Sequence, residues 1–256
     1  KAYGVLDGVT TNPSLIKKAV DKLQKKGEQI DIRDYIKKIL EVAKGYPVSL
    51  EVIGTNYDDM VTEGKMLFET FNPVADNVYI KVPVDPSFSR DSDMHFDGLK
   101  AIKTLADQGI PVNCTLIFTP EQALLAAKAG AHIVSPFAGR IDDYLRSENN
   151  IPFDKTDYFP AAGLLEGEVL EDNGVVSGID LVQQCVEVLD NYNFETQVLA
   201  ASLRNTRQTR EAALAGAHIA TLPFDVISEL LTHDKTIEGM ESFTKDIVPE
   251  YAQLFK

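Results

Sequence analysis

Cysteine is scarce in this sequence. Its 256 residues include two, Cys114 in a strand pattern and Cys185 in a helix pattern. Small secreted domains depend on several disulfides, whereas a cysteine among the apolar residues of a larger chain packs as a small core side chain. We therefore expect no disulfide and a reducing, cytoplasmic location.

Positive charge and histidine are also scarce. The 25 lysines and arginines are outnumbered by 39 aspartates and glutamates, which gives a formal net charge of −14 at pH 7. Nucleic acids and anionic membranes attract basic surfaces, so we expect neither as a partner. The four histidines lack ligand spacing such as HxxxH, which predicts no metal site. We expect structural roles for His132 and His218, which both follow Ala-Gly-Ala.

Long apolar runs and linkers are missing as well. No apolar run approaches the roughly 18 residues of a membrane span, and the first residues, Lys1–Gly4, do not resemble a signal peptide. No Ser/Gly-rich or low-complexity tract divides the chain, so we expect a single domain over residues 1–256. With 44% hydrophobic residues, such a chain can bury one large core.

Strand and helix patterns alternate along the whole chain. A first strand begins near Val5 and turns into a helix capped by Asn12, followed by Pro13. Six further strands are expected at residues 48–53, 79–84, 111–118, 132–137, 197–203 and 217–222. Helices are expected near residues 15–27, 31–43, 60–71, 99–109, 120–129, 179–189, 209–215, 226–231 and 237–255.

This alternation predicts an α/β fold. Ala-Gly-Ala-His-Ile occurs at residues 129–133 and again at 215–219, which indicates equivalent βα units. We expect a TIM (α/β)8 barrel with one of its eight strands absent from this chain. An open doubly wound sheet is the alternative, although Asp7–Thr10 lacks the GxGxxG pattern of its usual phosphate-binding turn.

The strand at residues 79–84 carries a lysine at its centre. Apolar residues at even positions from 78 to 84 alternate with Tyr79 and Lys81, so these two share a face. In a sheet covered by helices the ammonium would be partly buried, and desolvation favours the neutral amine, a nucleophile toward carbonyl carbon. Considered alone, Lys81 could equally form a structural ion pair with a carboxylate such as Glu51.

Polar side chains occur at the carboxyl ends of the expected strands, where barrel enzymes carry their chemistry. An amine, an acid, amides, hydroxyls and two arginines suit Schiff-base chemistry on a sugar phosphate, because arginine holds a phosphate dianion bidentately. Singly, each has a structural alternative: a helix cap for Asn12, a surface salt bridge for Arg140 and a pair with Glu211 for Arg204. The set comprises Asn12, Glu51, Lys81, Asn113, Thr115, Ser135, Arg140 and Arg204.

Six segments resemble the transaldolase family, and closely its short class I form, which is related to fructose 6-phosphate aldolase. They are Asp7–Ser14, Ser49–Val52, Ile80–Pro83, Asn113–Phe118, Ser135–Asp143 and Ala200–Asn205. The resemblance implies an (α/β)8 barrel enzyme without metal or organic cofactor. Such an enzyme moves a dihydroxyacetone unit from sedoheptulose 7-phosphate or fructose 6-phosphate to glyceraldehyde 3-phosphate or erythrose 4-phosphate in the pentose phosphate pathway.

The resemblance also implies roles for individual residues. Lys81 would form the imine with the ketose, while Glu51 and Thr115 would hold the water that passes protons. Glu51 and Phe137 favour a transaldolase, because the aldolase branch has glutamine and tyrosine at these positions. Fructose 6-phosphate aldolase and a non-catalytic sugar-phosphate-binding barrel are the alternatives. The expected substrate-binding residues are Asn12, Asn113, Ser135 and Phe137, and the expected phosphate-binding residues are Arg140, Ser202 and Arg204.

The sequence departs from the family pattern in three places. The family has an aspartate-bearing strand before the Thr-Thr-Asn-Pro segment, whereas this chain begins at Lys1, and Asp7 matches a non-catalytic position. We expect a version extended at the amino end to be more active. Residues 84–97 and 144–178 form long loop insertions at the active face, which are expected to be lids or, equally, surface or subunit contacts. We also expect a homo-oligomer.

Overall fold

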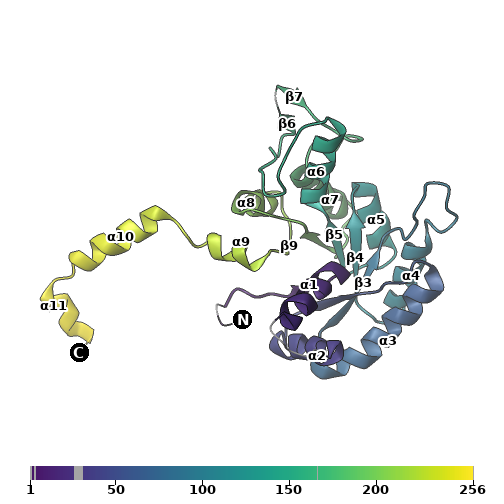
Figure 1. The fold of residues 1–256 in the computed structure, drawn as a ribbon, viewed down its shortest axis with the longest axis horizontal. Coiled ribbons are helices and arrows are strands. Elements are labelled where there is room, and N and C mark those ends of the chain that lie inside the picture. The colour runs from purple at the N-terminus through teal and green to yellow at the C-terminus, as the bar shows by residue number, and fades with distance from the viewer. Residues whose placement is uncertain (1, 3, 26–30, 166, 256) are drawn as a thin grey trace.

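A curled sheet of seven parallel strands forms the centre of the protein (Figure 1). The computed structural model describes residues 2, 4–25, 31–165 and 167–255. Each strand pairs in parallel with the next in the order β1, β2, β3, β4, β5, β8, β9. Their bounds are β1 (Val9–Thr10), β2 (Val48–Glu51), β3 (Val78–Pro83), β4 (Val112–Ile117), β5 (Ile133–Pro136), β8 (Gln197–Ala200) and β9 (Ile219–Ala220). All seven predicted strands are thereby confirmed, in a TIM-barrel-like α/β fold.

The two edges of the sheet meet through side chains. Within the described residues no backbone pairing joins β1 to β9. The hydroxyl oxygens of Thr10 and Thr221 nevertheless lie 2.8 Å apart, at hydrogen-bond distance. The sheet therefore curls almost into a ring with seven strands, where a complete TIM barrel has eight.

Helices follow the strands and cover the outer face of the sheet (Figure 1). Asn12 begins the first helix by accepting a hydrogen bond from the Leu15 N–H at 2.8 Å, with Pro13 at the first helical position. The helices are α1 (Pro13–Gln24), α2 (Ile32–Val42), α3 (Tyr57–Ala75), α4 (Asp97–Ala106), α5 (Pro120–Lys128), α6 (Ala138–Glu148), α7 (Gly178–Asn191), α8 (Thr206–Leu214), α9 (Phe224–Glu229), α10 (Asp234–Lys245), α11 (Pro249–Ala252) and a 3₁₀ turn, Gln253–Phe255.

Two expected boundaries are wrong. The insertion predicted at residues 144–178 begins with the end of α6, and it contains a small hairpin of β6 (Leu164–Leu165) and β7 (Glu168–Val169). The helix expected at residues 237–255 is divided into α10, α11 and the 3₁₀ turn. Pro249 supplies the reason for this second break, because proline disfavours helical backbone in the residue before it and begins α11 itself.

Apolar side chains hold the sheet from both sides. The larger cluster contains residues from strands and from α2 to α8, so it lies between the sheet and its helices. Gly64 of α3 leaves room there for Leu105 and Ile80, which an added Cβ would approach to 2.9 and 3.3 Å. The smaller cluster contains residues from strands and their ends alone, so it lies on the concave side: Ile133, Leu199 and Ala201, with Tyr79, Phe137 and Ile219 packed against them.

The repeated histidines lie at the amino ends of their strands and face the neighbouring strand. Nδ1 of His132 accepts from the Val112 N–H at 3.5 Å, and Nδ1 of His218 accepts from the Val198 N–H at 3.1 Å. Each ring therefore takes up an N–H at the start of the preceding strand of the sheet. These contacts agree with the structural role expected of both residues.

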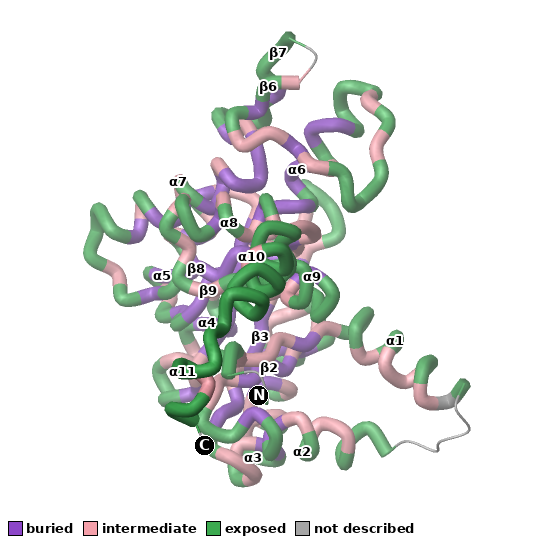
Figure 2. The backbone as a smooth tube through the Cα atoms, turned by 90° about the vertical axis from the view of Figure 1, so that its left-hand side faces the viewer, coloured by how far each residue is buried: buried purple, intermediate pink, exposed green. Residues whose placement is uncertain are grey.

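The carboxyl-terminal segment leaves the body of the protein. α10 and α11 extend to one side in Figure 1, and neither contains a buried residue. Figure 2 shows the contrast, with buried residues along the sheet and an exposed α10. Ile237, Phe243 and Leu254 are 55%, 74% and 75% exposed. No helix in the described ranges is long and apolar enough to cross a membrane.

Candidate active site

Lys81 lies in the middle of β3 with its side chain almost completely buried. The residue is 5% exposed, and its Nζ donates to Glu51 Oε2 at 2.9 Å and to the Thr11 carbonyl at 3.4 Å. Glu51 is the register partner of Lys81 on β2, so the parallel pairing itself places acid and amine side by side. The amine is thus dry and within proton-transfer distance of a carboxylate, the geometry that an imine-forming lysine needs.

Two cations approach the ring of Phe137. The centre of its ring is 5.8 Å from Lys81 Nζ and 5.0 Å from the guanidinium carbon of Arg140. Both distances fall within the range in which an aromatic ring attracts a cation. Within the described ranges Arg140 forms no ion pair, so the surface salt bridge considered for it is absent. Its charge therefore stays available to an anion.

A hydrogen-bonded row of polar groups crosses the concave face beside the lysine. Ser135 Oγ donates to Asn113 Oδ1 at 2.7 Å, and Asn113 Nδ2 donates to Ser49 Oγ at 3.0 Å. Sequence reasoning missed Ser49, although its position two residues before Glu51 puts it on the same face of β2. Thr115 is fully buried, and its hydroxyl has no hydrogen-bond partner in the part of the chain that the structure describes. An unpartnered buried hydroxyl is a place for a water or substrate hydroxyl.

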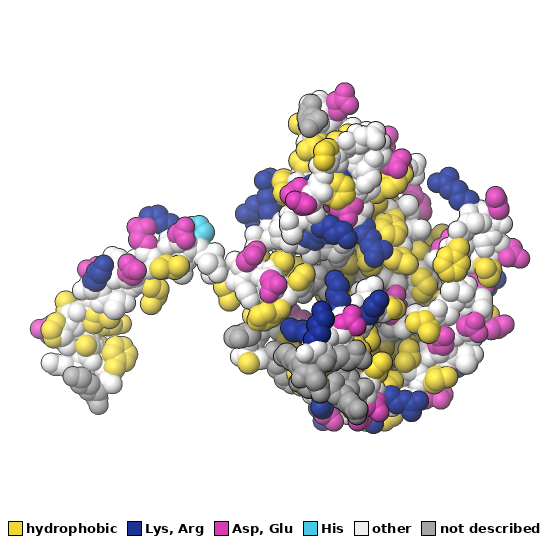
Figure 3. Space-filling view, viewed as in Figure 1, with side chains coloured by type: hydrophobic (Ala, Val, Ile, Leu, Met, Phe, Trp, Pro, Cys, Tyr) yellow, Lys and Arg dark blue, Asp and Glu magenta, His cyan; other side chains and the backbone are white. Residues whose placement is uncertain are grey.

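A cavity of about 380 Å³ opens at the carboxyl ends of the strands. It reaches the Thr10–Thr221 seam between the sheet edges. Lys and Arg side chains gather in the middle of the face shown in Figure 3, below the part of the molecule that carries α6, β6 and β7. Six of the predicted site residues line the cavity: Asn12, Lys81, Ser135, Phe137, Arg140 and Ser202.

Arg204 does not line this cavity. Its guanidinium pairs with both oxygens of Asp143, at 2.5 Å from Nη1 and 2.6 Å from Nη2, and Nη1 also donates to the Lys155 carbonyl at 3.0 Å. The expected alternative partner, Glu211, instead accepts from Arg207 and Tyr158. Asp143, missed as a functional candidate, stands at the end of the Ser135–Asp143 segment, and no local pattern indicates its distant partner.

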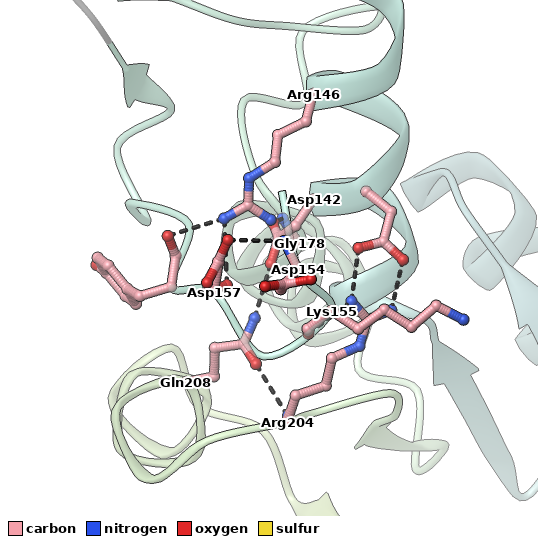
Figure 4. Close-up of polar contacts among 10 residues, drawn as sticks. Asp142, Arg146, Asp154, Lys155, Asp157, Gly178, Arg204 and Gln208 are labelled. Atoms are coloured by element: carbon pink, nitrogen blue, oxygen red, sulfur yellow. Dashed lines mark hydrogen bonds and ion pairs between the residues drawn. The ribbon is translucent and has the colours of Figure 1, made fainter. Parts of the chain in front are cut away.

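Residues 153–161, the strap, lie across α6 and are fixed to Arg146. This arginine is buried between the rings of Phe153 and Phe159, at 5.1 and 5.0 Å from their centres. Its Nη2 donates to the carbonyls of Asp157 and Tyr158 at 3.2 and 2.8 Å (Figure 4). These contacts hold the strap against α6.

Asp142 lies beneath the strap as a second buried ionisable group. It accepts hydrogen bonds from the Gly178 N–H and from Gln208 Nε2, both at 2.8 Å (Figure 4). Burial raises the pKa of Asp142 to about 6, although these hydrogen bonds and the charge of Arg146 act in the opposite direction. The carboxyl is therefore structural, because it faces protein groups and not the cavity.

The other insertion, residues 84–97, closes on itself through His95. Nδ1 of this residue lies 2.7 Å from Asp85 Oδ2, and Nε2 lies 3.0 Å from the Arg90 carbonyl. The hydrogen bond to Asp85 raises the pKa of His95. Across the described residues, no three His, Cys, Asp or Glu side chains group together in a way that could hold a metal ion.

Comparisons with known proteins match one family along almost the whole chain. The family model for Transaldolase/Fructose-6-phosphate aldolase matches residues 1–255. A probable transaldolase of Chlorobium phaeobacteroides strain BS1 is 42% identical over 243 residues, which cover 95% of this chain and 88% of the relative. Probable transaldolases of Aquifex aeolicus and Thermoplasma acidophilum are each 38% identical over 244 residues, which cover 95% of this chain and 88% and 86% of these relatives.

Proposed function

This chain belongs to the transaldolase/fructose-6-phosphate aldolase family, and we propose that it is a transaldolase that works through a Schiff base on Lys81. It would transfer dihydroxyacetone from sedoheptulose 7-phosphate or fructose 6-phosphate to glyceraldehyde 3-phosphate or erythrose 4-phosphate. The observation that carries the proposal is a buried amine paired with Glu51 in the same cavity as the unpaired guanidinium of Arg140. We further propose that it acts in the cytoplasm, in the pentose phosphate pathway.

In the first half of the reaction Lys81 attacks the ketose carbonyl. Glu51, 2.9 Å from the amine, takes the proton that the ammonium must lose, and returns it to the carbinolamine hydroxyl, which leaves as water. The unpartnered hydroxyl of Thr115 would hold the water that carries these protons. The proton of the C4 hydroxyl would then pass through this water to the re-ionised Glu51. The electrons of the C3–C4 bond would move into the iminium, so that an aldose phosphate leaves and an enamine remains on Lys81.

In the second half the enamine carbon attacks the aldehyde of the acceptor, Glu51 returns its proton to the new hydroxyl, and hydrolysis of the new imine frees Lys81. Asn113 and Ser135 would bind hydroxyls of the three-carbon unit, and Asn12 would do so from the start of α1. The phosphate would bind near Arg140, with Ser202 and Arg204 beside it. Because Lys81 and Arg140 both approach the ring of Phe137, this ring would lie near the reacting carbon and near the phosphate.

A product assay separates the transaldolase from the aldolase of the same family. With fructose 6-phosphate and erythrose 4-phosphate we expect sedoheptulose 7-phosphate to accumulate, with little free dihydroxyacetone, because Glu51 and Phe137 are the residues that favour transfer. Free dihydroxyacetone as the main product, without need of an acceptor, would assign the chain to fructose 6-phosphate aldolase. A chain that binds both sugars and turns over neither would be a sugar-phosphate-binding protein.

We also propose that the chain forms a homo-oligomer through α10 and α11. Ile237, Met240 and Phe243 recur at helical spacing and are all exposed, and the body of the same chain does not cover them (Figure 1). A second copy would bury this apolar stripe, and each large side chain contributes about 1.5–3 kcal/mol when fully buried. Exposed apolar surface of this kind is typical of an interface.

The change Phe243→Glu is expected to shift the protein from oligomer to monomer at micromolar concentration. A carboxylate in an apolar contact loses its hydration without gaining a partner. Light scattering after size-exclusion chromatography would measure the mass. Ser242→Glu is the matched control, because it adds the same charge at an exposed position on the opposite face of α10. A monomeric unmodified chain would contradict the proposal.

A further inference from the structure

Arg204 is held on two sides within the protein itself. Asp143, on the second turn of α6, takes one hydrogen from each terminal nitrogen of the guanidinium, and the Lys155 carbonyl of the strap takes a second hydrogen from Nη1 (Figure 4). The pair is mostly shielded, with side chains 17% and 21% exposed. An arginine on a flexible stem is thereby fixed in one orientation.

The remaining hydrogens of Arg204 point along a single edge. A guanidinium has five N–H groups, and the three contacts above use three of them. The two left over are the Nε–H and the second hydrogen of Nη2, which are parallel neighbours in the planar group. Neither has a hydrogen-bond partner among the described residues. Two parallel donors are the fork that binds a phosphate or carboxylate bidentately.

Gly139 lies against the guanidinium of Arg204. A Cβ added at this glycine would lie 3.0 Å from Arg204 Nε, 3.2 Å from its guanidinium carbon and 2.3 Å from the Ser202 carbonyl. Any side chain at this position would therefore crowd the guanidinium. Arg140, whose guanidinium lines the cavity, is the next residue along the chain. The guanidinium of Arg204 consequently lies beside the backbone that carries the other arginine.

We propose that Asp143 is a positioning residue for the substrate's phosphate: it holds the far edge of Arg204 so that the near edge, Nε and Nη2, faces the anion. This inference rests on the proposed function and deepens its phosphate site. A positioning role and simple charge neutralisation predict opposite effects of Asp143 on the binding of phosphate. A carboxylate that merely neutralised Arg204 would weaken the binding of a phosphate dianion through repulsion, whereas a positioning carboxylate strengthens it by orienting the donors in advance.

The nearly isosteric change Asp143→Asn separates the two roles. We expect the KM for a phosphorylated acceptor to rise about tenfold, since the amide cannot accept from both terminal nitrogens and a charge-assisted hydrogen bond is lost. Selectivity for glyceraldehyde 3-phosphate over unphosphorylated glyceraldehyde should fall by a similar factor. Asp143→Glu, which keeps the carboxylate, should recover part of this selectivity. Inorganic phosphate, used as a competitive inhibitor, should bind Asp143→Asn more weakly.

Two controls keep the outcomes distinct. Glu148→Gln removes the same charge from the exposed end of α6 and should leave the KM within about twofold, and equal thermal unfolding of all variants would exclude a folding defect. An unchanged or lower KM for Asp143→Asn would overturn the positioning role. Absence of turnover and of a borohydride-trapped adduct in the unmodified chain would instead overturn the proposed function, so the two failures are distinguishable.

Discussion

Replacing Lys81 by methionine is expected to reduce turnover by at least about three orders of magnitude, as is usual when a covalent nucleophile is lost. Methionine fills most of the same buried volume but offers no amine, so the ketose carbonyl finds no partner for an imine. Borohydride reduction in the presence of fructose 6-phosphate provides the direct measurement. The unmodified chain should gain the mass of one reduced dihydroxyacetone unit at Lys81, and the variant should gain none.

Lys100→Met is the matched control for this experiment. Lys100 belongs to a surface ion pair with Asp97, with a side chain 59% exposed, so its loss should affect neither trapping nor turnover. Binding of inorganic phosphate should survive in Lys81→Met, because Arg140 does not depend on the lysine for its position. Turnover that persisted in Lys81→Met, or an adduct mapped to another lysine, would refute the role given to Lys81.

Replacing Arg146 by methionine is expected to lower the free energy of unfolding by about 3 kcal/mol at pH 7.5. The change removes both hydrogen bonds to the strap carbonyls and the cation between Phe153 and Phe159. It also removes the larger of the two positive-charge effects, those of Arg146 and Arg204, that favour the buried Asp142 carboxylate. Urea unfolding would measure the loss. Lys103→Met, which removes an exposed surface pair with Asp107, should cost less than about 1 kcal/mol.

The loss should be smaller at pH 5 because Asp142 is then mostly protonated. Its pKa is raised from 3.8 to about 6 in the folded state, so between these values the folded protein holds a proton that the unfolded chain has released. The contribution of Asp142 to the free energy of unfolding is therefore fully present below pH 3.8, and it is lost as the pH rises from 3.8 through about 6. Adding Asp142→Asn to Arg146→Met should remove most of the pH dependence; an equal loss at both pH values would contradict this account.

The central part of the fold was predictable because it depends on short-range patterns. The period-two alternation around Lys81 predicts its face of β3, and Asn12 followed by Pro13 predicts the start of α1. The expected insertion 144–178 was less accurate. The polar and charged residues of α6 conceal a helix of which Asp142 and Arg146 are buried, since their partners lie on the strap, α7 and α8.

The contacts of the candidate site were likewise predictable only in part. Glu51 and Lys81 could be placed together in advance, because parallel strands set their neighbours by register. The partner of Arg204 could not, and the sequence suggested Glu211 in place of Asp143. Residues 204 and 143 are 61 positions apart, and their contact depends on how α6 packs against the end of β8. The close approach of Gly139 to the Ser202 carbonyl could not be predicted from the sequence either.

The sequence by itself determined the alternation of seven strands with helices, the inward position of Lys81 and the gathering of polar residues at one end of the sheet. Periodicity and helix caps depend on residues a few positions apart, so they are local properties of the chain. Tertiary structure alone decided that Asp143 orients Arg204, that Arg146 fixes the strap and that Thr10 meets Thr221. These contacts join distant segments, and they exist only because packing brings the segments within hydrogen-bond distance.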